Sequence, residues 1–273
     1  MNAPPDPSVF TDALGTRHPP AGPEARIACL VPSITELVCA LGLAGRLVAR
    51  TQFCIHPAEA LQSVPAVGGT KKVHLEKLRA LAPTHAILNV EENTREMEAA
   101  IRAFVPHVIV TYPKRPEDNP PLYRLLGAVF GKAAEAEALA AAFDLAYRRL
   151  AAERPALPAR RVLYFIWKDP WMGVSRGNYI ANMLGLVNWE VLGHRDGVDY
   201  PELDPALAAE ADLVLFSTEP YPFAEPDLDA FAAAHACPRA KLRIIDGEYV
   251  SWYGPRAIAG LDYLSAFAQA ARG

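Results

Sequence analysis

The segment KAAEAEALAAAFDLAYRRLAAER, residues 132–154, contains neither glycine nor proline. It is rich in Ala, Glu, Leu and Arg, and four apolar residues recur on one helical face: Leu139, Phe143, Ala146 and Leu150. About 23 residues at the standard rise make a helix of roughly 35 Å. Pro155 and Pro158 follow and end the pattern. The segment therefore predicts one long amphipathic helix that divides the chain into two parts.

Strand and helix patterns alternate on both sides of this helix. Strands are predicted at residues 26–31, 47–51, 84–90, 107–111, 161–166, 213–216 and 242–245. Helices are predicted at residues 32–41, 75–81, 93–104, 178–186 and 255–271. Ser33 with Glu36 three residues later predicts a capping box at the first helix. Alternation of this kind is typical of mainly parallel sheets.

The predicted fold class is α/β, with two Rossmann-like lobes joined by the long helix. The expected domains are an N-terminal extension (1–25), a first lobe (26–131), the linker helix (132–154) and a second lobe (155–273). A chain of 273 residues is long enough for either one large domain or two lobes. Two such lobes would place their strand ends across a cleft.

Composition excludes several classes of partner. A hydrophobic content of 51% excludes extensive disorder, and the net charge of −4 predicts no attraction to nucleic acid or to an anionic membrane surface. No apolar run approaches the roughly 18 residues of a membrane span, so membrane insertion is not expected. The first 20 residues do not resemble a secretory signal, which predicts a cytoplasmic protein; a signal upstream of Met1 would instead predict a periplasmic one.

Parallel sheets bind ligands beyond the carboxyl ends of their strands, so the residues that follow each predicted strand are the candidate site. Those residues are Glu91, Glu92, Asn93, Trp167, Lys168, Trp171, Glu219, Tyr221, Ser251, Trp252 and Tyr253. The aromatic members offer rigid surface for a flat ligand, or they seal the interface between the lobes. The polar members at 91–93 can hydrogen-bond a ligand; alternatively, Asn93 caps the next helix, with Glu96 completing the box.

Two further motifs carry weaker signals. Cys54 and His56 could ligate a metal, because alternate residues of an extended segment share a face, but no third ligand lies nearby and a structural role is favoured. The turn Gly68-Gly69-Thr70-Lys71 lacks the spacing of a P-loop, so its glycines are expected to let the backbone approach a ligand. The four cysteines have no CxxC spacing, which argues against structural zinc and against a redox dithiol.

Three stretches in this order resemble the cobalamin- and iron-chelate-type substrate-binding proteins of ABC importers, and are most similar to the cobalamin-binding branch: LVPSITEL (30–37), VPAVGG (64–69) and LEKLRALAP (75–83). The resemblance runs from about residue 26 to 264 and implies the class III periplasmic-binding-protein fold. It places the first ligand wall at the loop after the strand ending at Thr51 and at the Gly68-Gly69-Thr70 turn. The second wall is implied at Trp167 and Ser251-Trp252-Tyr253.

The resemblance implies a non-catalytic protein that captures a corrinoid or a related metal chelate in an interlobe cleft, with no obligatory cofactor. The candidate ligand-binding residues in addition to those above are Pro32, Ser33, Thr51, Cys54, Gly69 and Thr70. Family members dock on a permease through one carboxylate on each lobe; Glu76 matches the first, whereas Ser251 or the shifted Glu248 stands at the second. The alternatives are a cytoplasmic enzyme or chaperone acting on a tetrapyrrole or metal complex, and a binder of another small solute.

Overall fold

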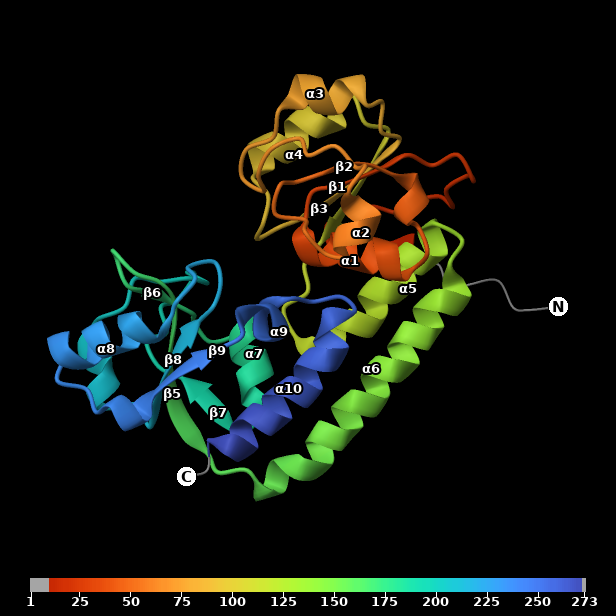
Figure 1. The fold of residues 1–273 in the computed structure, drawn as a ribbon. Helices are drawn as coiled ribbons and strands as arrows, with labels where there is room; N and C mark the ends of the chain where they lie inside the picture. Colours follow the sequence, from red (N-terminus) through yellow and green to blue (C-terminus); the bar gives the residue numbers. More distant parts are fainter. Residues whose placement is uncertain (1–9, 272–273) are drawn as a thin grey trace. The chain divides into compact units, whose positions relative to one another are not determined.

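The computed structural model of the protein describes residues 10–271 and divides them into two compact units. Unit 1 takes in residues 10–113, 117–143 and 253–255, and unit 2 takes in residues 114–116, 144–252 and 256–271. Each unit contains its own β-sheet with helices on both faces (Figure 1). The α/β class with mainly parallel sheets in two lobes, expected from the sequence, is confirmed.

The sheet of unit 1 has four parallel strands in the order β2-β1-β3-β4. The strands are β1 (Ile27–Cys29), β2 (Leu47–Arg50), β3 (His85–Asn89) and β4 (His107–Thr111). Its helices are α1 (Pro32–Ala40), α2 (Ala58–Leu61), α3 (Leu75–Ala80), α4 (Arg95–Arg102) and α5 (Asn119–Val129). Each predicted element in this part of the chain is present and differs in its bounds by at most two residues, while α2 and α5 were not predicted.

Side chains alternate between the two faces of this sheet. Ala28 and Leu88 point to the face covered by α3 and α4, where they pack with Leu78, Met97 and Ile101. All five side chains are buried. Because the strands are apolar on both faces, they read as continuous hydrophobic runs, as strands of parallel sheets do.

Two predicted helix caps are wrong. Helix α1 begins after Val31, with Pro32 at its first position, and no side chain caps it, so Ser33 and Glu36 form no capping box. Proline suits this position because its missing N–H has no partner there in any helix. Helix α4 is capped by Thr94, whose side chain accepts a hydrogen bond from the Met97 N–H, and not by Asn93.

The predicted extension at residues 1–25 lies partly outside the described residues, and its described part, residues 10–25, packs on unit 1. The carboxylate of Asp12 accepts a hydrogen bond from the Val110 N–H at 3.0 Å, and the Ala13 N–H donates to the Val110 carbonyl at 3.0 Å. Asp12 is also paired with His18, at 3.0 Å, and both are buried. Burial raises the pKa of Asp12, but the hydrogen bonds from His18 and from backbone N–H groups outweigh it and lower that pKa. The segment thus covers the outer edge of β4.

The sheet of unit 2 has the order β6-β5-β8-β9, and β7 also pairs with β5. Its strands are β5 (Arg160–Trp167), β6 (Met172–Gly173), β7 (Trp189–Val191), β8 (Leu213–Ser217) and β9 (Leu242–Ile245); all pairs are parallel except β5 with β6. Its helices are α7 (Tyr179–Gly185), α8 (Glu225–Ala234), α9 (Gly247–Ser251) and α10 (Arg256–Ala270). Helix α8 covers one face of this sheet, and the other three helices lie on the opposite side (Figure 1).

The long segment that divides the chain is helix α6 (Ala133–Glu153), whose first half belongs to unit 1 and second half to unit 2. The apolar stripe predicted on it, Leu139 excepted, is buried at Phe143, Ala146 and Leu150. Short 3-10 turns occur at Ala44–Arg46, Pro116–Asp118, Arg154–Ala156, Pro205–Ala209 and Arg239–Lys241. Among the helices between residues 10 and 271, none combines the length and the apolarity that a membrane crossing requires.

We predict that the free energy of unfolding falls when the pH drops below about 6.5. His85 stacks on His107 with ring centroids 4.7 Å apart, and burial, together with His107 and His18, lowers the pKa of His85 from 6.5 to about 4. The unfolded chain therefore takes up this proton first, which costs the folded state up to about 3 kcal/mol between pH 6.5 and 4. Urea denaturation across this range measures the slope. His85→Phe, which keeps a ring against Phe130, should flatten it; an unchanged slope in that variant would refute the assignment.

Candidate ligand-binding site

Exposed apolar side chains gather at the carboxyl edge of the sheet in unit 1. Phe53 and Ile55, which follow β2, are 52% and 51% exposed; Val90 after β3 is 40% exposed and Tyr112 after β4 is 37% exposed. Parallel strands end at one edge, so these four side chains lie on the same rim of the unit. A rim of apolar side chains left open to solvent is typical of a binding surface.

The side chain of Asn93 fixes this rim from within. Its carbonyl oxygen accepts from the Asn89 N–H at 2.8 Å, and its amide donates to the carbonyls of Thr70, at 2.9 Å, and Leu30, at 3.3 Å. Asn89 in turn accepts from the N–H groups of Glu91 and Glu92. Asn93 is therefore a structural tie between three segments, and the backbone that carries Glu91 and Glu92 is fixed by Asn89.

The turn at residues 68–73 forms one wall of this rim. The Gly69 N–H donates to the Lys72 carbonyl at 2.8 Å, and Gly68 has a φ of +126°, where a Cβ atom would lie 2.5 Å from that same carbonyl oxygen. A Cβ atom on Gly69 would lie 3.2 Å from the Phe53 ring. The two glycines thus allow a tight turn with an aromatic ring directly over it.

Below the rim, the candidates Thr51, Cys54 and Ser33 are buried, and Pro32 is half-buried. The Cys54 thiol lies 3.1 Å from the hydroxyl groups of both Thr35 and Thr51, and burial raises its pKa. The thiol has no exposed surface, so in this structure it serves packing and hydrogen bonding. His56 is half-buried in the following loop, and residues 10–271 contain no group of three His, Cys, Asp or Glu side chains able to hold a metal ion.

At the carboxyl edge of unit 2, Trp167 ends β5 and is 40% exposed. Its ring meets Tyr221 edge to face, with centroids 5.5 Å apart. The Lys168 amine lies 4.9 Å from the centre of the Tyr221 ring and is ion-paired with Asp227 at 2.5 Å. Hydrogen bonding to Asp227, and then to Tyr221, raises the pKa of Lys168. The structure thus brings Trp167, Lys168 and Tyr221 together. The two rings form an aromatic platform, and Asp227 neutralises the charge of Lys168.

Glu219 follows β8 and organises the next segment of that edge. Its carboxylate accepts hydrogen bonds from the Ser251 hydroxyl and from the Trp252 indole N–H, the latter at 2.9 Å, and burial raises its pKa. Trp252 is only 8% exposed, and Arg256 covers its ring at 4.9 Å. Tyr253 is buried as well. Ser251 and Trp252 therefore support the edge, and Trp167 offers more open surface than either aromatic at 252 and 253.

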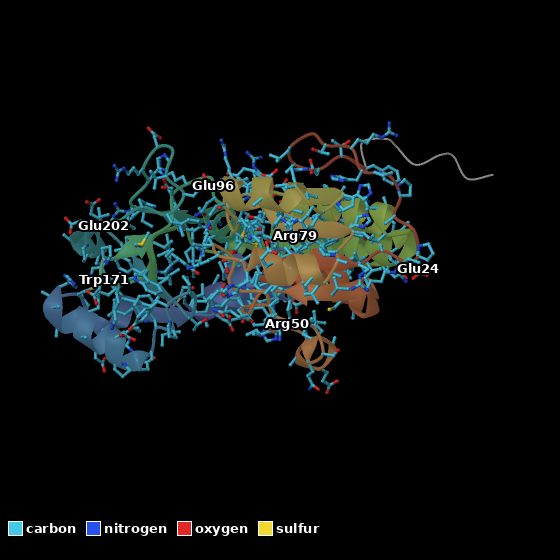
Figure 2. All side chains as sticks on the ribbon, turned by 90° about the horizontal axis from the view of Figure 1, so that it is seen from above. Glu24, Arg50, Arg79, Glu96, Trp171 and Glu202 are labelled. Atoms are coloured by element: carbon cyan, nitrogen blue, oxygen red, sulfur yellow. The ribbon has the colours of Figure 1, made fainter. Side chains whose placement is uncertain are left out.

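Trp171 is half-buried and packs against the aromatic core of unit 2. Its ring lies 4.8 Å from that of Phe165 in β5 and 5.1 Å from that of Phe231 in α8, and it stacks on Phe223 at 6.0 Å. Figure 2 shows Trp171 between the green β5–β6 segment and the blue α8 helix. Strand β6, which begins at Met172, turns the chain back along β5 and brings this ring onto the sheet.

Sequence reasoning did not single out the residues that the rim exposes most. Phe53, Ile55 and Tyr112 were not proposed, and Val90 was assigned to the strand. An apolar residue immediately after a predicted strand is the signal that could have found Val90 and Tyr112.

The sequence profile of the periplasmic binding protein family matches residues 27–236 of this chain. No curated protein sequence shows a significant match.

Solved structures share the fold. The periplasmic vitamin B12 binding protein BtuF of Vibrio cholerae is 18% identical, with a TM-score of 0.78 over 92% of this chain and 98% of that one. The periplasmic heme-binding protein RhuT from Roseiflexus sp. RS-1 is 23% identical, with a TM-score of 0.77 over 91% and 100% of the two chains. A periplasmic heme binding protein from Pseudomonas aeruginosa is 25% identical, with a TM-score of 0.76 over 89% and 91%.

We predict that Asn93→Ala destabilises the protein more than Thr94→Ala. The first change leaves the buried Asn89 N–H and the Leu30 carbonyl without their partner, which costs about 3 kcal/mol. The second removes one helix cap, which costs about 1 kcal/mol. Urea denaturation of both variants measures the difference. An equal or larger loss in Thr94→Ala would show that Asn93 is not the tie described above.

Proposed function

Because the chain belongs to the periplasmic binding protein family, whose members bind solutes for ABC transporters without catalysing a reaction, we propose that it reversibly captures a corrinoid or a related metal chelate. In each unit, the carboxyl edge of the sheet is a candidate capture surface. Affinity comes from burial of apolar ligand surface against exposed aromatic side chains, and orientation comes from a few polar groups of the loops. No covalent step is required.

One observation carries this proposal. Among residues 10–271, seven large apolar side chains are exposed, and five of them follow or end a strand at a carboxyl edge: Phe53, Ile55, Val90, Tyr112 and Trp167. The remaining two, Leu14 and Leu145, lie away from the strand ends. Exposed apolar side chains scattered at random would show no such preference, whereas a surface that buries an apolar ligand requires it.

The class of ligand follows from the kind of surface and from the similar proteins. Phe53 and Trp167 present rings that suit a large, flat and partly apolar molecule. The similar structures include proteins named for vitamin B12 and for heme, which are both metal-bearing macrocycles. A macrocyclic chelate satisfies both considerations.

We predict that cobinamide, cobalamin or heme quenches the tryptophan fluorescence of the purified protein with a saturable dependence on ligand concentration. Phe53→Ser and Trp167→Ser each remove one aromatic contact and should weaken binding about tenfold, the equivalent of about 1.4 kcal/mol. Leu145→Ser, which removes an equally exposed apolar side chain from helix α6, is the matched control and should bind as the wild type does.

Two outcomes would contradict the proposal. Equal losses in all three variants would show that the carboxyl edges have no special role. A lack of saturation with every macrocycle would exclude this ligand class and direct the search to another small solute by native mass spectrometry.

We also propose that Glu76 is a docking residue for an ABC permease. Glu76 lies in the first turn of α3 with 88% of its side chain exposed, and its nearest cation, Arg79, is 3.9 Å away. In unit 2, the Glu248 carboxylate is ion-paired with Arg256 at 3.0 Å. Ser251 has no carboxylate, and its hydroxyl donates a hydrogen bond to Glu219.

Glu76→Ala should reduce ligand uptake by the importer that accepts the wild-type protein while the ligand dissociation constant stays the same. The physical reason is that an exposed carboxylate contributes to a protein interface through charge complementarity and not to the ligand surface. Glu59→Ala, which removes an exposed carboxylate from α2 of the same unit, is the control. Normal uptake with Glu76→Ala would contradict a docking role.

A further inference from the structure

A pocket of about 430 Å³ lies in unit 1 beside the exposed ring of Phe53. Residues from two segments line it: Gln52, Phe53, Gly68, Gly69, Thr70, Lys71, Lys72 and His74. Gln52 and Phe53 follow β2, so the pocket opens on the carboxyl edge of the sheet described above. It is formed by residues of this unit alone.

The turn that carries Lys71, Lys72 and His74 is held by three contacts of its own backbone and by one side-chain contact. The Gly69 N–H donates to the Lys72 carbonyl, and the His74 N–H donates to the Val67 carbonyl, both at 2.8 Å. The Thr70 carbonyl is held by Asn93, and the Lys71 amine donates to the Glu91 carbonyl. Lys72 and His74 therefore project from a fixed turn, which lowers the entropy cost of using them to bind.

The pocket has a one-sided charge. Its lining contains two lysines and one histidine and no aspartate or glutamate. The Lys71 amine donates to the Glu91 carbonyl, whereas the side chains of Lys72 and His74 make no hydrogen bond or ion pair within residues 10–271. By contrast, Lys168 at the carboxyl edge of unit 2 is neutralised by Asp227. Within the described part of the chain, the Lys72 ammonium is thus left without an ionic partner at one defined place of the apolar rim.

We infer that this pocket binds a carboxylate side arm of the ligand, an assignment that rests on the proposed function. Lys72 and His74 supply charge-assisted hydrogen bonds to the carboxylate, while Phe53, packed over Gly69, contacts the apolar body of the ligand beside it. The chemistry selects a metal chelate or tetrapyrrole with free carboxylates over one whose side arms are all amides or esters. Lys72 and His74 are then specificity-determining residues of this chain.

The test compares iron protoporphyrin, which has two free propionates, with its dimethyl ester, by fluorescence titration at about 20 mM and about 300 mM salt. We expect the wild type to bind the diacid about tenfold more tightly at low salt, and this preference to shrink at high salt, because exposed charges are screened there. The double variant Lys72→Gln/His74→Gln should lose most of the preference. Arg148→Gln, which removes an exposed cation from helix α6, should keep it.

The outcomes separate this inference from the proposed function. If diacid and ester bind equally well to the wild type, or if the double variant keeps the preference, the carboxylate pocket is overturned while macrocycle binding stands. If neither porphyrin binds and cobinamide and cobalamin also fail, the proposed function is overturned and the pocket assignment falls with it. Thermal unfolding of the double variant, expected to match the wild type because both side chains are exposed, verifies that a lost preference does not reflect a lost fold.

Discussion

The hydrogen bonds of one buried amide, Asn93, hold together the edge of unit 1 on which the proposed function depends. They join the end of β1, the end of β3 and the turn at residues 68–73. Asn89 is the last residue of β3, and Leu30 and Thr70 lie outside the strands, so the Asn89 N–H and the carbonyls of Leu30 and Thr70 find their partner in a side chain. A side chain with two donors and a carbonyl acceptor meets this need at a single position. The turn that carries Lys71 and Lys72 is held to the sheet by that network.

In unit 2 a carboxylate, that of Glu219, joins the chain segments at the carboxyl edge of the sheet. Glu219 accepts hydrogen bonds from Ser251 and Trp252 and thereby fixes the end of α9 beside the end of β8. Burial opposes its ionisation, so this arrangement costs the folded chain more than a neutral amide does. Each unit therefore has one largely buried polar side chain in the loop that follows a central strand, Asn93 after β3 and Glu219 after β8.

The strands and the long helix could be predicted because their signals are local. Apolar runs bounded by turn residues place β3, β4, β8 and β9 to within two residues, and a run free of glycine and proline predicts α6. The roles of Asn93 and Trp171 could not be predicted, because they depend on distant partners. Asn93 looks like a helix cap until the Leu30 carbonyl, 63 residues away, is brought beside it. Trp171 follows a predicted strand, but its ring packs on Phe231 of α8, a helix that was not predicted. Those contacts exist only in the folded chain.

The covering of β4 by residues 10–18 has a practical consequence. An edge strand with free N–H and C=O groups is a template for pairing with another chain. Here the outward N–H and carbonyl of Val110 are both occupied, by Asp12 and Ala13. Residues 10–18 therefore prevent β4 from pairing with a strand of another molecule. A truncation or tag that displaces residues 10–18 would leave the Val110 N–H and carbonyl unpaired at the edge of the sheet. Such a protein would aggregate although its carboxyl edge is unchanged.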